Sequence, residues 1–184
     1  MYLVSAYVKP GDTVLDATCG NGHDTLALAK LEPGKLCAFD VQPGAVSNTR
    51  RHLEENGYGK SLLDGRFIVE QLSHEDLSSR FKYPDMPAQV NAAVFNLGYL
   101  PGGDKSIATR AGSTLTAVQS AMDLLSKDGI ICITMYSGHP EGREEKQALL
   151  AFAQSLDSRI WHTAYVSMPN QKNDPPEILL ITRK

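Results

Sequence analysis

The sequence is poor in cysteine, in long apolar runs and in excess positive charge. Its three cysteines, Cys19, Cys37 and Cys132, form no C-x-x-C pair, and two of them lie in apolar segments. We therefore expect buried thiols, with neither a disulfide nor a metal site. No apolar run approaches the roughly 20 residues of a membrane-spanning helix. The first ten residues lack the charged and apolar regions of a signal peptide, so we expect a cytoplasmic protein without a membrane partner.

The formal net charge of −3 lacks the basic surplus that is typical of nucleic-acid-binding proteins. It does not exclude nucleic acid, because affinity for phosphates needs only a local basic patch. Five cations lie in or beside segments that we expect near one edge of a sheet: Lys105, Arg110, Arg143, Lys146 and Lys172. For any single one of them, a solvated surface position is the simpler interpretation.

Short apolar segments alternate with helical segments along the 184 residues, without repeats, low-complexity tracts or a second domain. The apolar segments predict seven strands, at residues 13–17, 35–41, 66–69, 89–96, 130–136, 160–166 and 178–182. Helices are predicted at residues 23–31, 43–59 (ending at Gly57 and Gly59), 73–83, 113–126 and 143–156. This alternation predicts one α/β domain of residues 1–184. Its seven-stranded, mostly parallel sheet has helices on both faces and a ligand crevice at the carboxyl ends of the strands.

Residues 13–29 predict a strand, a tight turn and a helix. The turn D-A-T-C-G-N-G, from Asp16 to Gly22, contains two glycines, which let the backbone turn sharply and approach a ligand closely. The helix that follows directs unpaired N–H groups at the same point. Thr25 stands where the dinucleotide-binding pattern G-x-G-x-x-G has its third glycine, which disfavours an NAD-linked dehydrogenase. Asp40 ends the second strand and can accept hydrogen bonds from two ribose hydroxyls, as it also would in an NAD-binding protein.

The glycine turn and Asp40 together resemble motifs I and II of the class I S-adenosylmethionine (SAM) methyltransferases. The resemblance implies SAM as cofactor, with its amino acid and ribose portions on the turn and Asp40. Ser73, His74 and Glu75 would meet the adenine. The predicted cofactor-binding residues are Asp16, Thr18, Gly20, Asn21, Gly22, Asp24, Thr25, Asp40, Gln42, Ser73, His74, Glu75, Asn96 and Leu97.

The segment N-L-G-Y follows the fourth strand and resembles the N-P-P-Y motif of methyltransferases that modify amino nitrogens. Leu97 and Gly98 stand in place of the two prolines. In that motif the asparagine oxygen and a backbone carbonyl accept hydrogen bonds from the amine, and the aromatic ring stacks on the base. The resemblance assigns these catalytic roles to Asn96 and Tyr99. Methyl transfer from a sulfonium is an in-line displacement that depends on positioning and needs no metal.

No cysteine lies in residues 96–105 or 136–143, the segments that we expect beside the substrate. Methylation of a pyrimidine ring carbon through a covalent adduct requires a thiolate beside the base. Cys19 lies in the glycine turn that we expect to bind the cofactor, not beside the substrate. The sequence therefore argues against ring-carbon methylation.

Six segments extend the resemblance over nearly the whole chain: D-A-T-C-G-N-G-H-D-T, F-D-V-Q, S-H-E-D-L, N-L-G-Y-L-P-G-G-D-K, Y-S-G-H-P-E-G-R-E-E and N-Q-K-N-D-P-P. They resemble the YtqB family, labelled rRNA methylases, whose members act as tRNA methyltransferases of the MnmM type. These enzymes convert wobble 5-aminomethyl-2-thiouridine to its 5-methylaminomethyl form. The resemblance implies binding of the tRNA anticodon stem-loop and leaves a homodimer open. It assigns substrate contacts to Gly98, Tyr99, Asp104, Lys105, His139, Arg143 and Asn170.

The chain departs from the family pattern at Pro140 and Glu141, where a further glycine is expected. A primary alkylamine is nucleophilic once deprotonated, so orientation and desolvation suffice without a strong base. His139 is a candidate for accepting the proton or contacting RNA, and a purely structural role is the alternative. We expect Glu144 and Glu145 on a helix surface. An rRNA or small-molecule N-methyltransferase and a non-catalytic SAM- or RNA-binding module stay open as alternatives.

Overall fold

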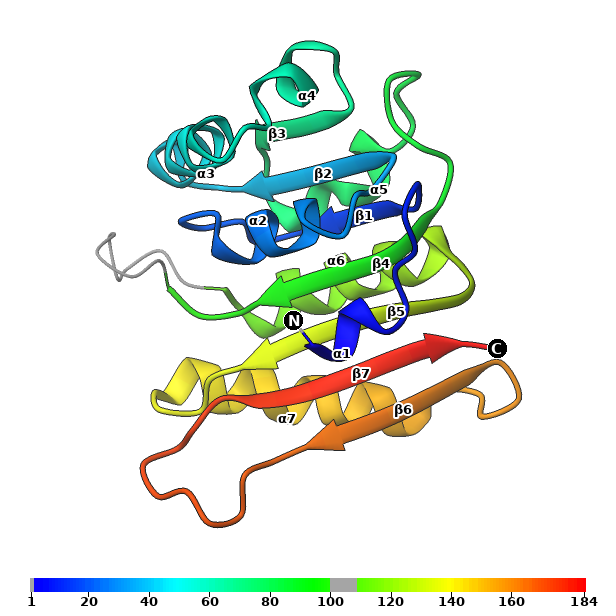
Figure 1. Ribbon diagram of the computed structural model, residues 1–184. Helices are drawn as coiled ribbons and strands as arrows, with labels where there is room; N and C mark the ends of the chain where they lie inside the picture. The colour runs from blue at the N-terminus through cyan, green and yellow to red at the C-terminus, as the bar shows by residue number, and fades with distance from the viewer. Residues whose placement is uncertain (1, 100–108) are drawn as a thin grey trace.

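The computed structural model describes residues 2–99 and 109–184. Within them a seven-stranded sheet has the order β3-β2-β1-β4-β5-β7-β6 (Figure 1). The strands are β1 (Thr13–Asp16), β2 (Lys35–Asp40), β3 (Phe67–Gln71), β4 (Val90–Asn96), β5 (Leu125–Met135), β6 (Trp161–Val166) and β7 (Glu177–Arg183). Neighbours from β3 to β5 pair in parallel, whereas β7 is antiparallel to both β5 and β6. This confirms the prediction of a mostly parallel α/β sheet.

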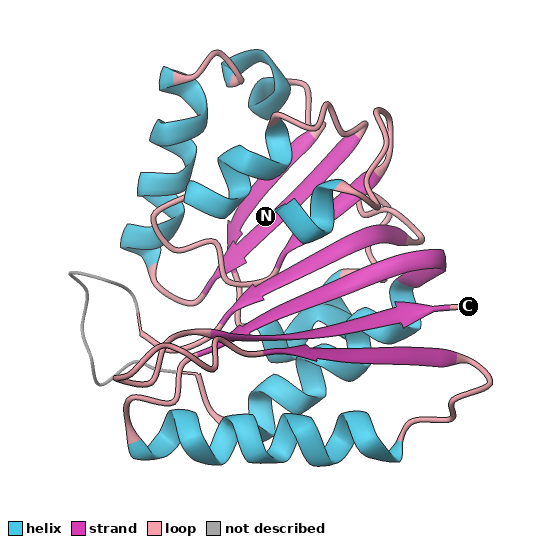
Figure 2. Cartoon of the chain, turned by 60° about the horizontal axis from the view of Figure 1, so that its bottom comes forward, coloured by secondary structure: helices cyan, strands magenta, loops and turns pink. Residues whose placement is uncertain are grey.

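Helices cover both faces of the sheet (Figure 2). One face carries α1 (Tyr2–Ser5), α2 (His23–Ala29), α3 (Pro43–Glu55) and α4 (Gly59–Leu63). The other face carries the 3₁₀ turn η1 (His74–Asp76), α5 (Leu77–Arg80), α6 (Ala111–Leu124) and α7 (Pro140–Ser155). In the described residues, no helix is both long and apolar enough to span a bilayer.

The middle positions of the central strands are apolar on both sides because each face of the sheet has its own core. Along β2, Cys37 and Phe39 belong to the core under α5 to α7, and Leu36 and Ala38 to the core under α1 to α4. The three cysteines are free and buried, as predicted. Because the middles of the strands are buried in these cores, the polar side chains at the strand ends are the groups of the sheet that a ligand can reach.

Several boundaries differ from the sequence-based prediction. Gly57, at φ +89°, ends α3, but Gly59 begins α4 instead of closing the same helix. Helix α6 stops at Leu124 rather than at residue 126, because Leu125 already pairs with Val90 at the start of β5. Residues 127–129, between the predicted helix and the predicted strand, thus lie inside β5, near the point where the register with β4 shifts.

Helix α7 begins at Pro140, three residues earlier than predicted. His139 is its N-cap, and its ring accepts the N–H of Gly142. Proline at the first helical position costs no hydrogen bond, since that N–H would be unpaired in any case. The helix start therefore accommodates the family departure at Pro140 and Glu141.

Candidate active site

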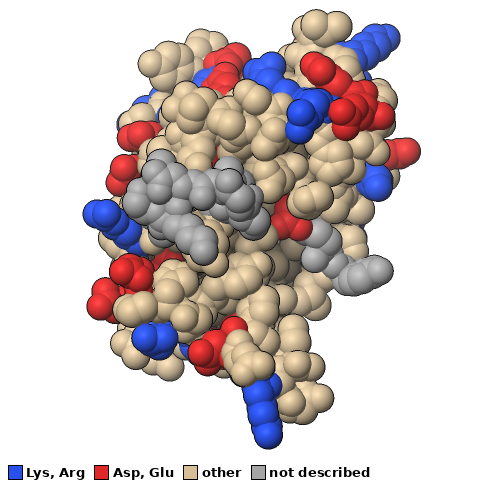
Figure 3. All heavy atoms as spheres, turned by 90° about the vertical axis from the view of Figure 1, so that its left-hand side faces the viewer, with Lys and Arg blue, Asp and Glu red and all other residues tan. Residues whose placement is uncertain are grey.

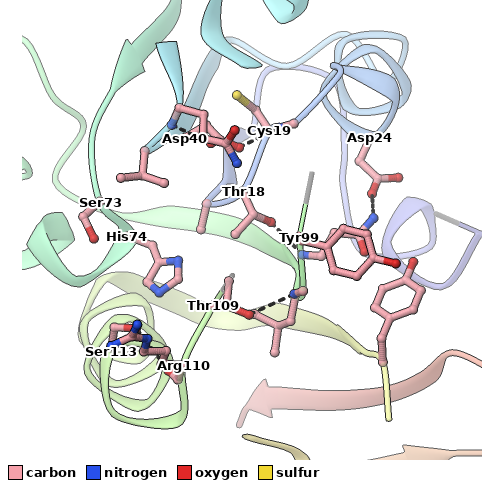
Figure 4. Close-up of a pocket in the computed structure, with 18 of the residues that line it drawn as sticks. Thr18, Cys19, Asp24, Asp40, Ser73, His74, Tyr99, Thr109, Arg110 and Ser113 are labelled. Atoms are coloured by element: carbon pink, nitrogen blue, oxygen red, sulfur yellow. Dashed lines mark hydrogen bonds between the residues drawn. The ribbon is translucent and has the colours of Figure 1, made fainter. Parts of the chain in front are cut away.

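A cavity of about 770 Å³ opens at the carboxyl ends of β1, β2, β4 and β5. Figure 3 faces this edge of the sheet, and Figure 4 shows the cavity in close-up. Most predicted site residues line it: Thr18, Gly20, Asn21, Asp24, Asp40, Gln42, Ser73, His74, Glu75, Asn96, Leu97, Gly98, Tyr99 and His139. The parallel strands explain this convergence, because their carboxyl ends meet at one edge.

Other predicted site residues do not line the cavity. Arg143 donates from Nη1 to the Ser137 carbonyl at the start of α7, and Asn170 is exposed in the loop between β6 and β7. Asp104 and Lys105 lie outside the described residues.

Asp16 and Thr25, also away from the cavity surface, stabilise the glycine turn from beneath. Asp16 is 1% exposed, and it accepts the Thr25 hydroxyl at 2.6 Å and the Thr18 N–H at 3.2 Å. Burial raises the pKa of Asp16 to about 7, although the bond from Thr25 opposes the rise. These bonds fix the shape of the loop between β1 and α2.

Gly22 allows α2 and α3 to approach each other closely. It has φ +83°, and a Cβ there would come within 2.9 Å of the Thr49 backbone. The Thr49 hydroxyl donates to the Gly20 carbonyl at 3.0 Å. A larger residue at Gly22 would therefore displace the turn that lines the cavity.

Asp40 connects the ends of β1 and β2. One carboxylate oxygen accepts the Gly20 N–H at 3.0 Å, and the other accepts the Gln42 N–H at 2.9 Å. Each oxygen keeps a lone pair for a further donor. Asp40 lines the cavity, so a vicinal diol such as a ribose fits this carboxylate.

His74 lies farther along the same wall, next to Ser73 (Figure 4). It is 9% exposed, and burial lowers its pKa, so the ring is neutral at pH 7. Its Nε2 has no hydrogen-bond partner in the part of the chain that the structure describes. Leu72 and Leu97 supply apolar surface to the same cavity. A planar, polar ring such as adenine fits this combination of an unpaired nitrogen and apolar walls.

Asn96 ends β4 and is held by its backbone and its side chain. Its N–H donates to the Thr18 hydroxyl at 2.7 Å, and its Nδ2 donates to Asp24 at 3.1 Å (Figure 4). Tyr136, at the end of β5, lines the cavity beside it. Burial, and next the charge of Asp24, raise the pKa of the Tyr136 phenol, whereas a hydrogen bond with Asn96 opposes the rise.

Tyr99 and His139 both line the cavity, and their rings are neighbours with centroids 6.1 Å apart. The Gly142 N–H lies 3.0 Å from His139 Nδ1, which therefore accepts, so the neutral ring carries its proton on Nε2. Glu141 is 3.4 Å from the same Nδ1 and would pair with the ring only if it were protonated. A proton added at Nδ1 would break the hydrogen bond from the Gly142 N–H that caps α7. The geometry therefore favours a structural or donor role over a base.

A network from α7 holds the segment that follows Asn96. The Gly98 N–H donates to the Thr109 hydroxyl at 2.9 Å, and the Thr109 N–H donates to the Gly98 carbonyl at 3.0 Å. The Thr109 hydroxyl donates to Glu145 at 2.9 Å, and the Thr114 hydroxyl donates to the other carboxylate oxygen. Glu145 is 2% exposed, so the prediction of a surface position was wrong for it, whereas Glu144 is exposed as predicted.

Several cavity residues were not among the predicted site residues. These are Ala17, Cys19, His23, Val41, Leu72, Thr109, Arg110, Ser113, Tyr136, Gly138 and Asp174. Ala17, Cys19, His23, Val41, Tyr136, Gly138 and Asp174 fall inside the recognised segments, and position in these segments could have found them. Thr109, Arg110 and Ser113 become visible only once the start of α6 is known.

On the face shown in Figure 3, Lys and Arg side chains are interspersed with Asp and Glu, and those drawn in blue form no continuous patch. Lys146 pairs with Glu177, and Arg110 lines the cavity itself. Lys172 is exposed, and Lys105 is not among the described residues. No three His, Cys, Asp or Glu side chains are grouped to hold a metal ion within residues 2–99 and 109–184.

Comparison with known proteins finds a matching family model and a relative that is similar over nearly the whole of this chain. The family model described as Putative rRNA methylase matches residues 36–182. The chloroplastic tRNA (mnm(5)s(2)U34)-methyltransferase of Arabidopsis thaliana is 35% identical over 96% of this chain, which spans 65% of the length of that relative.

Two solved structures have the same fold. A putative rRNA-methylase from Clostridium thermocellum is 38% identical, with a TM-score of 0.88 over 100% of this chain and 94% of the other. A putative methyltransferase from Streptococcus mutans, in complex with SAH, is 33% identical, with a TM-score of 0.82 and the same coverage. The prediction of a class I SAM methyltransferase fold is confirmed, and the chain belongs to the Putative rRNA methylase family.

Proposed function

We propose that this protein is a SAM-dependent methyltransferase that acts on RNA. We further propose that its substrate is the 5-aminomethyl nitrogen of wobble 5-aminomethyl-2-thiouridine in tRNA. The observation that carries the proposal is the single cavity that joins the glycine turn and Asp40 to Asn96 and Tyr99. The name of the Arabidopsis thaliana relative and the SAH bound to the Streptococcus mutans structure support the same conclusion.

The described residues suit SAM in three parts of the cavity. The turn at Gly20 and Asn21 would take the amino acid portion, Asp40 the ribose hydroxyls, and His74 with Leu97 the adenine. The bound cofactor supplies a methyl group on a cationic sulfonium. The cavity lining contains Asp24, Asp40, Glu75 and Asp174 against Arg110, and this acidic balance favours a cation over an anion.

The amine substrate must lose a proton before it can attack. Desolvation in the half-buried cavity disfavours the ammonium form and so assists that loss, whereas the carboxylates of the lining oppose it, and the proton leaves to solvent. The Asn96 amide oxygen would accept an N–H of the amine and direct the nitrogen lone pair at the methyl group, while Tyr99 stacks on the base. The N–C bond then forms as the C–S bond breaks, and the product amine carries the positive charge.

The experiment that tests this function is a nucleoside analysis. Purified protein is incubated with SAM and with tRNA that carries 5-aminomethyl-2-thiouridine, and the nucleosides are separated by mass spectrometry. We expect one methyl group to be added to this nucleoside and to no other. A reaction without SAM is the control, and the absence of any methylated product would reject the proposed substrate.

An rRNA or small-molecule N-methyltransferase is the second candidate. It is favoured by the lack of a continuous basic patch among the described residues of this face, because tRNA binding commonly uses a basic surface (Figure 3). The same assay with rRNA and with a mixture of small primary amines separates the candidates. If SAH binds but no acceptor is methylated in any reaction, the non-catalytic module becomes the better interpretation.

We further propose that residues 1–184 act as one domain, in the cytoplasm, without a membrane partner. Cell fractionation tests the location. Mass photometry of the purified protein decides between a monomer and a homodimer.

A further inference from the structure

We propose that Asp24 is a positioning residue, which fixes the side-chain amide of Asn96 so that its oxygen faces the incoming amine. The sequence predicts a cofactor contact for Asp24, and the geometry points to this different role. The inference rests on the proposed function, because it names the group that orients the acceptor for the nitrogen.

The first step is the direction of one hydrogen bond. Asp24 lies in the first turn of α2, and Asn96 lies at the end of β4, beside β1. The Asn96 Nδ2 and the Asp24 Oδ2 are 3.1 Å apart. A carboxylate can only accept, so the amide nitrogen must point at Asp24. The amide oxygen therefore points the other way.

The second step is the rigidity of the backbone that carries this amide. The Asn96 N–H donates to the Thr18 hydroxyl at 2.7 Å, and Asn96 pairs with Thr134 of β5. With the backbone fixed, the remaining freedom is rotation of the side chain. Asp24 removes that freedom, since rotation by half a turn would bring two acceptors together.

The third step concerns the other groups that face the amide. Tyr136 is hydrogen-bonded with Asn96, and its phenol is a titratable group that faces the amide from the end of β5. A phenol can donate or accept, so it does not choose an amide orientation by itself. Asp24 therefore sets the orientation of the Asn96 side-chain amide. Its loss would allow the NH₂ group to face the amine, and two donors would then repel each other.

The test is a double-mutant cycle of Asp24→Asn and Asn96→Ala, measured with tRNA and SAM. We expect Asp24→Asn to lower kcat about 10- to 100-fold, the range of a hydrogen bond to a charged group. Affinity for SAH, measured by calorimetry, should stay within about twofold. In the Asn96→Ala background the same change should alter kcat by less than about twofold, because the two residues act as a unit.

The exchanged pair, Asp24→Asn with Asn96→Asp, sharpens the cycle. It restores the bond with reversed polarity and leaves a carboxylate oxygen toward the amine, so it should be faster than Asp24→Asn alone. Asp123→Asn on the exposed side of α6 removes one negative charge far from the cavity and should keep wild-type rates. Thermal unfolding checks that every variant is folded.

Three results would overturn the inference: a weaker SAH affinity with unchanged kcat, additive losses in the cycle, or no effect of Asp24→Asn. If the wild-type protein methylates none of the acceptors, the proposed function has failed. The contact between Asp24 and Asn96 is then tested by NMR instead of by turnover. The Asn96 side-chain amide signals, assigned by their disappearance in Asn96→Asp, must then shift in the NMR spectrum of Asp24→Asn. Unchanged signals would reject the contact.

Discussion

The two halves of the cavity are built in different ways. On the side that we propose for the cofactor, called the cofactor side below, Asp40 joins neighbouring strand ends by accepting the N–H groups of Gly20 and Gln42. On the side that we propose for the substrate, called the substrate side below, Gly98 is held by Thr109, which is held by Glu145 from a helix 36 residues farther along the chain. The first half thus depends on a local motif and the second on side chains that meet only in the folded protein. Four predictions test this difference, beginning with the largest expected effect.

Asn96→Ala should damage the substrate side alone. Turnover should fall about 100-fold or more, because an acceptor aimed at the reacting group contributes mainly in the transition state. SAH affinity should stay close to that of the wild type. Single-turnover kinetics and calorimetry measure the two effects. Unchanged turnover would remove Asn96 from the mechanism.

Asp40→Ala should damage the cofactor side alone. We expect SAH affinity to fall about 10- to 100-fold, because two hydrogen bonds to a charged group are lost. With saturating SAM, turnover should largely recover. Asp40→Asn, which keeps one acceptor oxygen, is the matched control and should lose less affinity. A loss of kcat that saturating SAM does not restore would show that the two halves are not separate.

Glu145→Gln should loosen the substrate side from a distance. An amide cannot accept both the Thr109 and the Thr114 hydroxyls as the carboxylate does, so one buried group loses its partner. We expect a loss of about 1–3 kcal/mol in the free energy of unfolding and about a tenfold loss in kcat/KM for tRNA. Glu144→Gln, on the exposed side of α7, is the control. Equal behaviour of the two variants would contradict the role of the network.

Asp16→Asn should have the smallest effect on activity and change the pH dependence of stability. Burial raises the folded-state pKa of Asp16 to about 7, above its unfolded value of 3.8. Its stabilising contribution is therefore complete below about pH 4 and is lost as the pH rises through 7, by at most about 1.4 kcal/mol per pH unit. Urea unfolding between pH 4 and 8 should show a decline in the wild type that the variant lacks. Parallel curves would mean that Asp16 does not titrate in this range.

The fold and the cofactor side were accessible from the sequence because they are local. A strand, a glycine turn and a helix lie within residues 13–29, and Asp40 follows the next strand directly. The predictions of the α/β fold and of the family are confirmed. The sequence also predicted Asn96, which lines the cavity, because it ends a strand in a recognisable motif.

The substrate side was harder because its partners are distant. Glu145 follows another glutamate in a charged helix, which resembles a solvated surface, and nothing near it in the sequence indicates Thr109 or Thr114. Tyr136 was inside a named segment, but its contact with Asn96 depends on the pairing of β4 with β5. The tautomer of His139 follows from the cap on α7, which the late predicted helix start concealed.

The antiparallel direction of β7 determines which loop of this fold can vary beside the cavity. Because β6 and β7 form an antiparallel hairpin, their connection, residues 167–176, lies at the same rim as the cavity (Figure 1). It brings Asp174 to the cavity without any crossover helix. Surface loops of this kind tolerate insertions and exchanges. On the proposed function, we expect a graft of this one loop between relatives to change substrate preference and to leave the cofactor half untouched.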